Sequence, residues 1–227
     1  MKITWLGHSG FKIEIAGETL LIDPFLTGSP VFPSDRMAEA TDGVTHILLS
    51  HGHGDHVGDA CTIAKDKGLP VSGMVELMAY VAGQGVETTT GFNKGGTISI
   101  GEVKVTMVNA THSSATPDGV YAGSEAGFMI EGEGHTIYFS GDTDVMADMK
   151  VFNDLHNPDI GILCCGGFYT MDMKRAAYAA KTFFDFKTLI PCHYKTFPVL
   201  EQSAQPLKDA LPGVDVVEPE VLGTIDL

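Results

Sequence analysis

The stretch Leu48-Leu49-Ser50-His51-Gly52-His53-Gly54-Asp55-His56-Val57 places three histidines and one aspartate within six positions, directly after an apolar run. Histidine and aspartate carry the ligand atoms that zinc, iron and manganese accept. The intervening residues are glycines, which let the backbone turn tightly without a Cβ clash. A solvated histidine-rich loop is the alternative. The pattern favours a metal site on a turn that follows a strand.

The segments around this cluster predict a β-rich first half. Short β-type runs separated by glycine-containing turns are expected at Lys2–Leu6, Phe11–Ile15, Thr19–Ile22, His46–Leu49 and Val71–Gly73. Leu26–Ala40 is rich in Pro, Gly and Ser and predicts a loop. Helical spacing predicts helices over Val57–Lys67 and Val75–Gln84, so the histidine cluster lies on a strand-to-helix turn.

The second half repeats this plan. Strands are expected at Val103–Val108, Phe128–Ile130, Thr136–Phe139, Ile160–Leu163 and Thr188–Ile190, with a helix over Met173–Phe184. No linker composition divides the chain, so we expect a single domain over residues 1–227. Two β-rich halves, each with helices, suit an α+β fold of two sheets covered by helices.

Composition excludes several classes of partner. The chain has 14 basic and 29 acidic side chains, a formal net charge of −15. This surplus argues against nucleic acid and against anionic membranes, since both attract lysine and arginine. There is neither a signal-peptide pattern nor an apolar run of roughly 18 residues that could span a bilayer. The four cysteines form no spaced framework, which predicts reduced thiols and a cytoplasmic location.

Three further strands of this prediction end in a possible metal ligand. His112 follows the run from Val103, Asp142 follows the run from Thr136, and His193 follows the run from Thr188. Because strand ends share one rim of a sheet, such positions can converge in space even though they are far apart in sequence. The recurrence beside the histidine cluster favours one shared metal centre.

With these residues, the chain resembles the metallo-β-lactamase superfamily: an HxHxDH run, a single His, a single Asp after a strand and a final His. It is also similar to a group of small bacterial metal-dependent hydrolases related to the ascorbate-6-phosphate lactonase-like branch. Trp5-Leu6-Gly7-His8-Ser9, Asp23-Pro24-Phe25, Gly91-Phe92-Asn93-Lys94-Gly95-Gly96-Thr97, Phe139-Ser140-Gly141-Asp142-Thr143 and Cys192-His193-Tyr194-Lys195-Thr196-Phe197 carry this second resemblance. The resemblance implies a four-layer αββα sandwich of two mixed β-sheets flanked by helices.

The resemblance also implies a ligand set for two divalent ions. One ion would take His51, His53 and His112, the other would take Asp55, His56 and His193, and Asp142 would bridge them. Zinc is the first expectation, with manganese, iron or nickel as alternatives, because histidine and carboxylate ligands suit all four.

The implied activity is that of a dinuclear metal-dependent hydrolase acting on a small molecule. A metal-bridging hydroxide would attack an ester, lactone, thioester or phosphoester, and Asp55 would orient that nucleophile or move a proton during turnover. The resemblance favours lactones and phosphate-bearing substrates. Two alternatives are a non-catalytic metal-binding or regulatory module and a di-iron redox protein of the same fold. The redox proteins typically carry glutamate where this chain has His53.

Other residues are expected near the metals or the substrate. Asp23 would hold a ligand imidazole or a loop, unless it only begins a turn with Pro24. His8 would contact the substrate or the residues that support the ligands, unless it is a plain residue of the turn Gly7–Gly10. Lys94, on the polar turn after Asn93, and Lys195 would hold a substrate phosphate or carboxylate, unless they are merely solvated. Cys192 directly precedes His193 and is a further candidate for contact with a metal or with a metal ligand.

Self-association is a separate expectation. Val31–Pro33 and Met74–Tyr80 are candidate apolar patches for a homo-oligomer.

Overall fold

A computed structural model describes all residues, 1–227, and contains two seven-stranded β-sheets. The first sheet has the order β14-β1-β2-β3-β4-β5-β6. Its strands are β1 (Lys2–Gly7), β2 (Gly10–Ile15), β3 (Glu18–Ile22), β4 (His46–Leu49), β5 (Val71–Met74), β6 (Thr89–Phe92) and β14 (Thr224–Asp226). Pairing is antiparallel from β14 to β3 and parallel from β3 to β6, so the sheet is mixed.

The second sheet has the order β13-β12-β11-β10-β9-β8-β7. Its strands are β7 (Thr97–Ile100), β8 (Val103–Asn109), β9 (Ala126–Gly132), β10 (His135–Phe139), β11 (Ile160–Cys164), β12 (Thr188–Cys192) and β13 (Asp215–Val216). Pairing is antiparallel from β7 to β10 and parallel from β10 to β13. The repeated plan expected from the sequence is therefore present in both sheets.

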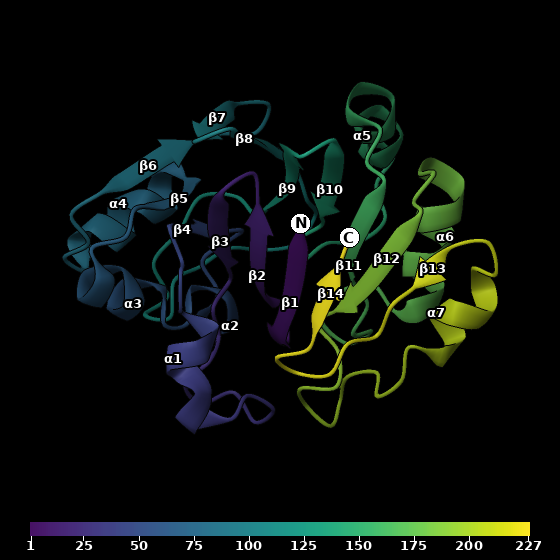
Figure 1. The fold of residues 1–227 in the computed structure, drawn as a ribbon, viewed down its shortest axis with the longest axis horizontal. Helices are drawn as coiled ribbons and strands as arrows, with labels where there is room; N and C mark the ends of the chain where they lie inside the picture. Colours follow the sequence, from purple (N-terminus) through teal and green to yellow (C-terminus); the bar gives the residue numbers. More distant parts are fainter.

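Helices cover the outer faces of the two sheets (Figure 1). The helices of the chain are α1 (Met37–Ala40), α2 (Gly54–Val57), α3 (Ala60–Lys67), α4 (Val75–Gly83), α5 (Asp148–His156), α6 (Met173–Phe183) and α7 (Gln205–Ala210). The helices α3 and α4 lie beside the first sheet, and α5, α6 and α7 lie beside the second. The predicted four-layer αββα sandwich is confirmed. None of these helices has the length and apolar character needed to cross a bilayer.

The core lies between the sheets and beneath the helices. A cluster of 63 buried apolar residues fills it. Phe11 of β2 meets Phe139 of β10 edge-on with ring centroids 6.1 Å apart, and Phe128 of β9 stacks on Phe139 at 6.4 Å. Aromatic rings from both sheets thus join the two halves. That residues 1–227 form a single domain stays a prediction, and this shared core is consistent with it.

The prediction of one continuous helix over Val57–Lys67 is wrong. The chain forms α2, breaks at Gly58, and resumes as α3. Gly58 has a φ of +42°, and a Cβ there would lie 2.3 Å from the carbonyl oxygen of Pro24. Only glycine permits this approach, which packs the ligand-bearing turn onto the segment after β3. The predicted loop Leu26–Ala40 contains a 3₁₀ turn, Ser34–Arg36, and the short helix α1.

The apolar stretches suggested for self-association contribute mainly to the core. Phe32, Met74, Leu77 and Met78 are buried, whereas Val75 is exposed. A homo-oligomer stays a prediction.

Acid should destabilise the fold through His46. This buried side chain of β4 places its Nε2 2.7 Å from the Ser72 hydroxyl, and burial, partly offset by Glu18, lowers the pKa of His46 to about 4. Between about pH 6.5 and about pH 4 the unfolded chain binds a proton here that the folded protein does not. Unfolding free energy should therefore decrease as pH falls through this window. Urea titrations should show a shallower decrease in His46→Gln, and identical slopes would contradict this assignment.

Candidate metal centre

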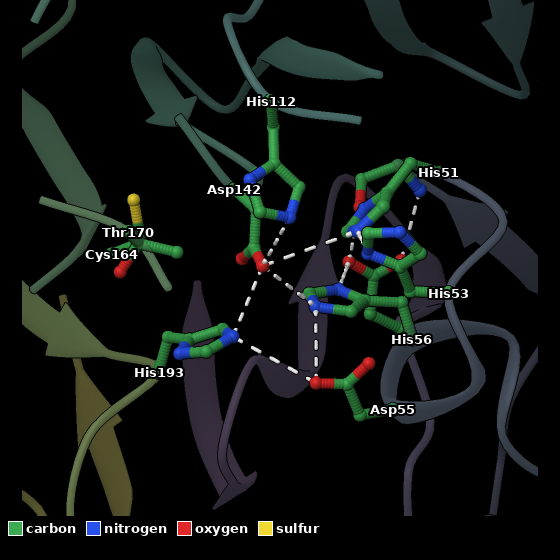
Figure 2. Close-up of polar contacts among 12 residues, drawn as sticks. His51, His53, Asp55, His56, His112, Asp142, Cys164, Thr170 and His193 are labelled. Atoms are coloured by element: carbon green, nitrogen blue, oxygen red, sulfur yellow. Dashed lines mark hydrogen bonds and ion pairs between the residues drawn. The ribbon is translucent and has the colours of Figure 1, made fainter. Parts of the chain in front are cut away.

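All seven residues predicted as ligands converge at one rim of the sandwich (Figure 2). His51 and His53 follow β4, Asp55 and His56 lie on α2, and His112, Asp142 and His193 follow β8, β10 and β12 respectively. Their side chains point toward one another from both halves of the chain. The convergence expected from the strand ends is thus present.

Three histidines form a first group of potential ligands. The ligand nitrogens of His51, His53 and His112 all lie within 4.8 Å of one another. His51 Nε2 and His53 Nδ1 are 3.0 Å apart. Three imidazole nitrogens at this spacing can surround one cation.

A second group contains Asp55, His56 and His193, and it also includes His8. The ligand atoms of these four residues lie within 4.8 Å of one another. Asp55 Oδ2 is 3.8 Å from His193 Nε2 and 4.0 Å from His56 Nε2. This mixed carboxylate and imidazole group offers a second position for a cation.

Asp142 lies between the two groups. Its Oδ2 is 3.0 Å from His193 Nε2, 3.3 Å from His56 Nε2, 3.5 Å from His112 Nε2 and 4.0 Å from His51 Nε2. Only 2% of the side chain is exposed, and Oδ1 is buried without a hydrogen-bond partner. One carboxylate therefore faces both potential metal positions.

The donor atoms at this centre fit divalent metal. His56 Nε2 is buried and has no hydrogen-bond partner, while its Nδ1 lies 2.7 Å from Asp23 Oδ2. The Asp23 carboxylate accepts a hydrogen bond from Nδ1–H, so Nε2 is the nitrogen that faces the centre. Burial lowers the pKa of His56, but Asp142 and Asp23 outweigh it and hold that pKa well above its ordinary value, so a cation at Nε2 would displace a proton. A cation beside that atom and beside Asp142 would complete both groups.

The pKa shifts of Asp142 and His51 favour the forms that bind metal. Burial raises the pKa of Asp142, but the neighbouring His193 and His56 outweigh it and hold that pKa well below its usual range. Burial, with His56 adding to it, lowers the pKa of His51 well below its ordinary value. Ionised carboxylate and neutral imidazole are the forms that bind metal.

Asp23 positions one histidine of each group. Its carboxylate accepts hydrogen bonds from the Ser50 amide at 2.9 Å, the Ser50 hydroxyl at 2.5 Å and His56 Nδ1 at 2.7 Å. The Ser50 hydroxyl also lies 3.0 Å from His51 Nδ1. Asp23 therefore contacts His56 directly and His51 through Ser50, a residue that the sequence analysis missed although it precedes the first histidine.

Replacing Asp23 should weaken both metal positions. Asp23→Asn keeps the shape but leaves one acceptor oxygen, so His51 and His56 lose part of their orientation. We expect metal affinity to fall by about 10–100-fold, as is usual when a partner of a ligand histidine is removed. Competition with a chromophoric chelator would measure this loss. The control is Asp59→Asn, whose carboxylate accepts the Leu26 and Thr27 amides. Equal affinities in both variants would contradict the positioning role.

His8 is fully buried and contacts Asp55. Its Nε2 lies 2.9 Å from Asp55 Oδ2 and its Nδ1 lies 2.8 Å from the Thr196 hydroxyl. Burial and the charge of His193 lower the pKa of His8 to about 4. A neutral His8 therefore donates Nε2–H to Asp55 and accepts from Thr196. Thr196 lies in the motif Cys192–Phe197, but nothing in that motif predicted its contact with His8.

The lysines suggested for substrate binding are engaged elsewhere. Lys94 Nζ donates to Asn109 Oδ1 at 2.7 Å, and Lys195 forms an ion pair with Glu218. Asn93 is exposed on the turn between β6 and β7, and its side chain accepts from the Lys94 amide. Cys192 is buried. Asn93, Lys94, Cys192 and Lys195 do not line the cavity at the centre. Their contacts with substrate or metal stay predictions, and the interactions seen for the two lysines and Asn93 do not support them.

A cavity of about 440 Å³ opens onto the centre. Its lining residues are His53, Asp55, His112, Ser113, Asp142, Tyr169, His193 and Phe197. The sequence analysis assigned no role to Tyr169 or to Phe197, although Phe197 ends the motif that begins at Cys192, because neither position shows from sequence which cavity it faces. The volume suits a small molecule.

The chain matches known proteins over its whole length. Residues 2–193 match the model of a family described as a beta-lactamase superfamily domain. Proteins of Dinoroseobacter shibae and Paracoccus denitrificans, both called UPF0173 metal-dependent hydrolase, are 67% and 60% identical, with all of each chain covered. The solved structure of a metallo hydrolase from Ignicoccus hospitalis is 28% identical, with a TM-score of 0.86 over 100% of this chain and 98% of that chain.

Proposed function

Because this chain belongs to the beta-lactamase superfamily and is a metal-dependent hydrolase, we propose that it uses two divalent ions to hydrolyse a small molecule. The bond cleaved would be an ester, lactone, thioester or phosphoester. The observation that carries the proposal is the position of Asp142 Oδ2 between the nitrogens of His193, His56 and His112 at 3.0, 3.3 and 3.5 Å. One carboxylate in contact with both groups suits a pair of cations better than one.

The two groups would divide the ions between them. His51, His53 and His112 would hold one, Asp55, His56 and His193 would hold the other, and Asp142 would contact both. When bound, such ions polarise the oxygen of the scissile group and lower the pKa of a bound water toward neutrality. Zinc is our first choice of metal, since three imidazoles on one ion suit it.

Asp55 is the residue that we propose for a part in the reaction itself. It lines the cavity, and the hydrogen bond from His8 fixes its Oδ2. Burial raises the pKa of Asp55, but the charge of His56 and the bond from His8 outweigh it and hold the pKa well below its usual range. Asp55 therefore carries a negative charge at neutral pH, and its free oxygen can accept a hydrogen bond from the attacking water and set its direction.

Metal removal and substrate screening test this function together. Protein treated with a strong chelator should lose hydrolysis of its best lactone, ester, thioester or phosphodiester, and Zn²⁺ or Mn²⁺ should restore it. Restoration should require two equivalents of metal per chain. Full activity with one equivalent, or hydrolysis that survives complete metal removal, would contradict the proposal. The small-molecule substrate and the cytoplasmic location expected from the sequence remain part of this proposal.

A further inference from the structure

The residues that line the cavity are of two chemical kinds, potential metal ligands and aromatic side chains. Five lining residues belong to the candidate centre, and Ser113 lies next to one of them, His112. The remaining two, Tyr169 and Phe197, are aromatic. A substrate that places its scissile group at the centre therefore has aromatic surface available for the rest of its structure.

No lysine or arginine lines this cavity. The ammonium of Lys195 is held by Glu218, which Lys208 also approaches at 3.4 Å, and Lys94 is bound to Asn109. An anionic substituent placed away from the centre would thus lose hydration without gaining a charged partner, which is unfavourable. The formal net charge of −15 adds long-range repulsion of anions.

Tyr169 is presented by a fixed turn between β11 and α6. The Gly167 amide donates to the Met171 carbonyl at 3.0 Å, and the Met171 amide donates to the Thr143 carbonyl at 3.1 Å. Tyr169 packs edge-on against Phe168 with ring centroids 4.8 Å apart, yet it remains 56% exposed. Because Tyr169 lines the cavity and is still exposed, its ring is available to pack against a bound molecule.

Phe197 comes from a second loop, after β12. It is half-buried, and its ring meets the His8 ring edge-on at 5.7 Å. The amide of Glu201 donates to the Gly166 carbonyl at 2.9 Å, which joins this loop to the one that carries Tyr169. The two aromatic residues are therefore supported by connected backbone segments.

We propose that this cavity selects an uncharged substrate whose aromatic or branched aliphatic group packs against Tyr169 and Phe197. The inference rests on the proposed hydrolase function and narrows its substrate class to neutral esters and lactones with an apolar substituent. It also sets aside the phosphate-bearing substrates that the sequence resemblance favoured.

Matched lactones provide the test in the metal-loaded enzyme. A γ-butyrolactone bearing a phenyl group should be hydrolysed with a higher kcat/KM than the same ring bearing a carboxymethyl or phosphomethyl group. Tyr169→Ala should lower kcat/KM for the phenyl lactone by roughly 10-fold and lower kcat/KM for the anionic lactones by a smaller factor. Phe197→Leu, which keeps apolar volume, should have a smaller effect. Tyr178→Ala is the matched control, because Tyr178 on α6 is also exposed and lies outside the cavity.

A binding measurement separates this inference from the hydrolase proposal. The phenyl-substituted tetrahydrofuran, a cyclic ether that cannot be hydrolysed, should bind by calorimetry and lose about 10-fold in affinity in Tyr169→Ala. Binding of this ether with the expected Tyr169 dependence, but no hydrolysis of any lactone or ester, would support the inference and overturn the reaction. Faster hydrolysis of the phosphomethyl lactone, or equal loss in Tyr169→Ala and Tyr178→Ala, would overturn the inference and leave the reaction standing.

Discussion

Asp142→Ala should lose more metal than any other single substitution in the centre. Asp142 Oδ2 lies within 3.5 Å of nitrogens from both ligand groups, so its removal takes a ligand from each proposed ion. It also leaves two positive ions in a buried site with one carboxylate fewer. We expect the affinity for metal to fall by more than about 100-fold. This exceeds the loss that is usual when a residue hydrogen-bonded to a metal ligand is replaced. Metal analysis after gel filtration, with chelator competition for the affinity, would measure it.

The control for this variant is Asp144→Ala. Asp144 is only two positions away, but its carboxylate is half-exposed and lies 3.8 Å from Arg175 outside the centre. This variant should retain the metal content of the wild type. Metal content unchanged in Asp142→Ala would show that this carboxylate does not bridge two ions.

Asp55→Asn should reduce turnover more than it reduces metal content. Asparagine keeps the shape and one oxygen, and that oxygen can still accept the hydrogen bond that His8 Nε2 donates to Asp55 Oδ2 at 2.9 Å. The neutral amide, however, is a much weaker acceptor for the proton of an attacking water. A decrease in kcat on the order of 10²-fold per bound metal pair is expected for loss of a group with this role.

The comparison must be made at equal metal occupancy, because loss of metal alone would also lower turnover. Asp59→Asn serves as the matched variant, since Asp59 lies four positions along the chain and its carboxylate binds the Leu26 and Thr27 amides. If the fully metallated Asp55→Asn protein hydrolysed its best substrate at the wild-type rate, Asp55 would act only as a ligand.

The sequence predicted the elements that determine where the centre lies. The run His46–Leu49 forms β4 with the bounds expected, and the ligands beyond β8, β10 and β12 lie where those strands end. Short apolar strands are readable because their side chains must be buried on both faces under covering helices. Since strand ends share a rim, the convergence of His112, Asp142 and His193 on the histidine cluster could be inferred without knowing any loop.

Features that depend on tertiary packing could not be predicted in this way. The break at Gly58 reflects the close approach of Pro24, which is distant in sequence. The strand β14 pairs with β1 although nearly the whole chain separates them, and it has no pattern of its own. The engagement of Lys195 by Glu218 likewise depends on how the C-terminal segment folds back, so a lysine beside His193 looked available when it was not.

A crystal structure of the metal-loaded protein, with anomalous diffraction collected at the absorption edge of its metal, tests the dinuclear centre most directly. We expect two anomalous peaks, one bound by His51, His53 and His112 and the other by Asp55, His56 and His193. The Asp142 carboxylate should contact both ions. The distances from the ions to the histidine nitrogens should be about 2.0–2.1 Å if the metal is zinc. A single peak in fully loaded crystals, or two peaks without Asp142 on both, would contradict the dinuclear centre.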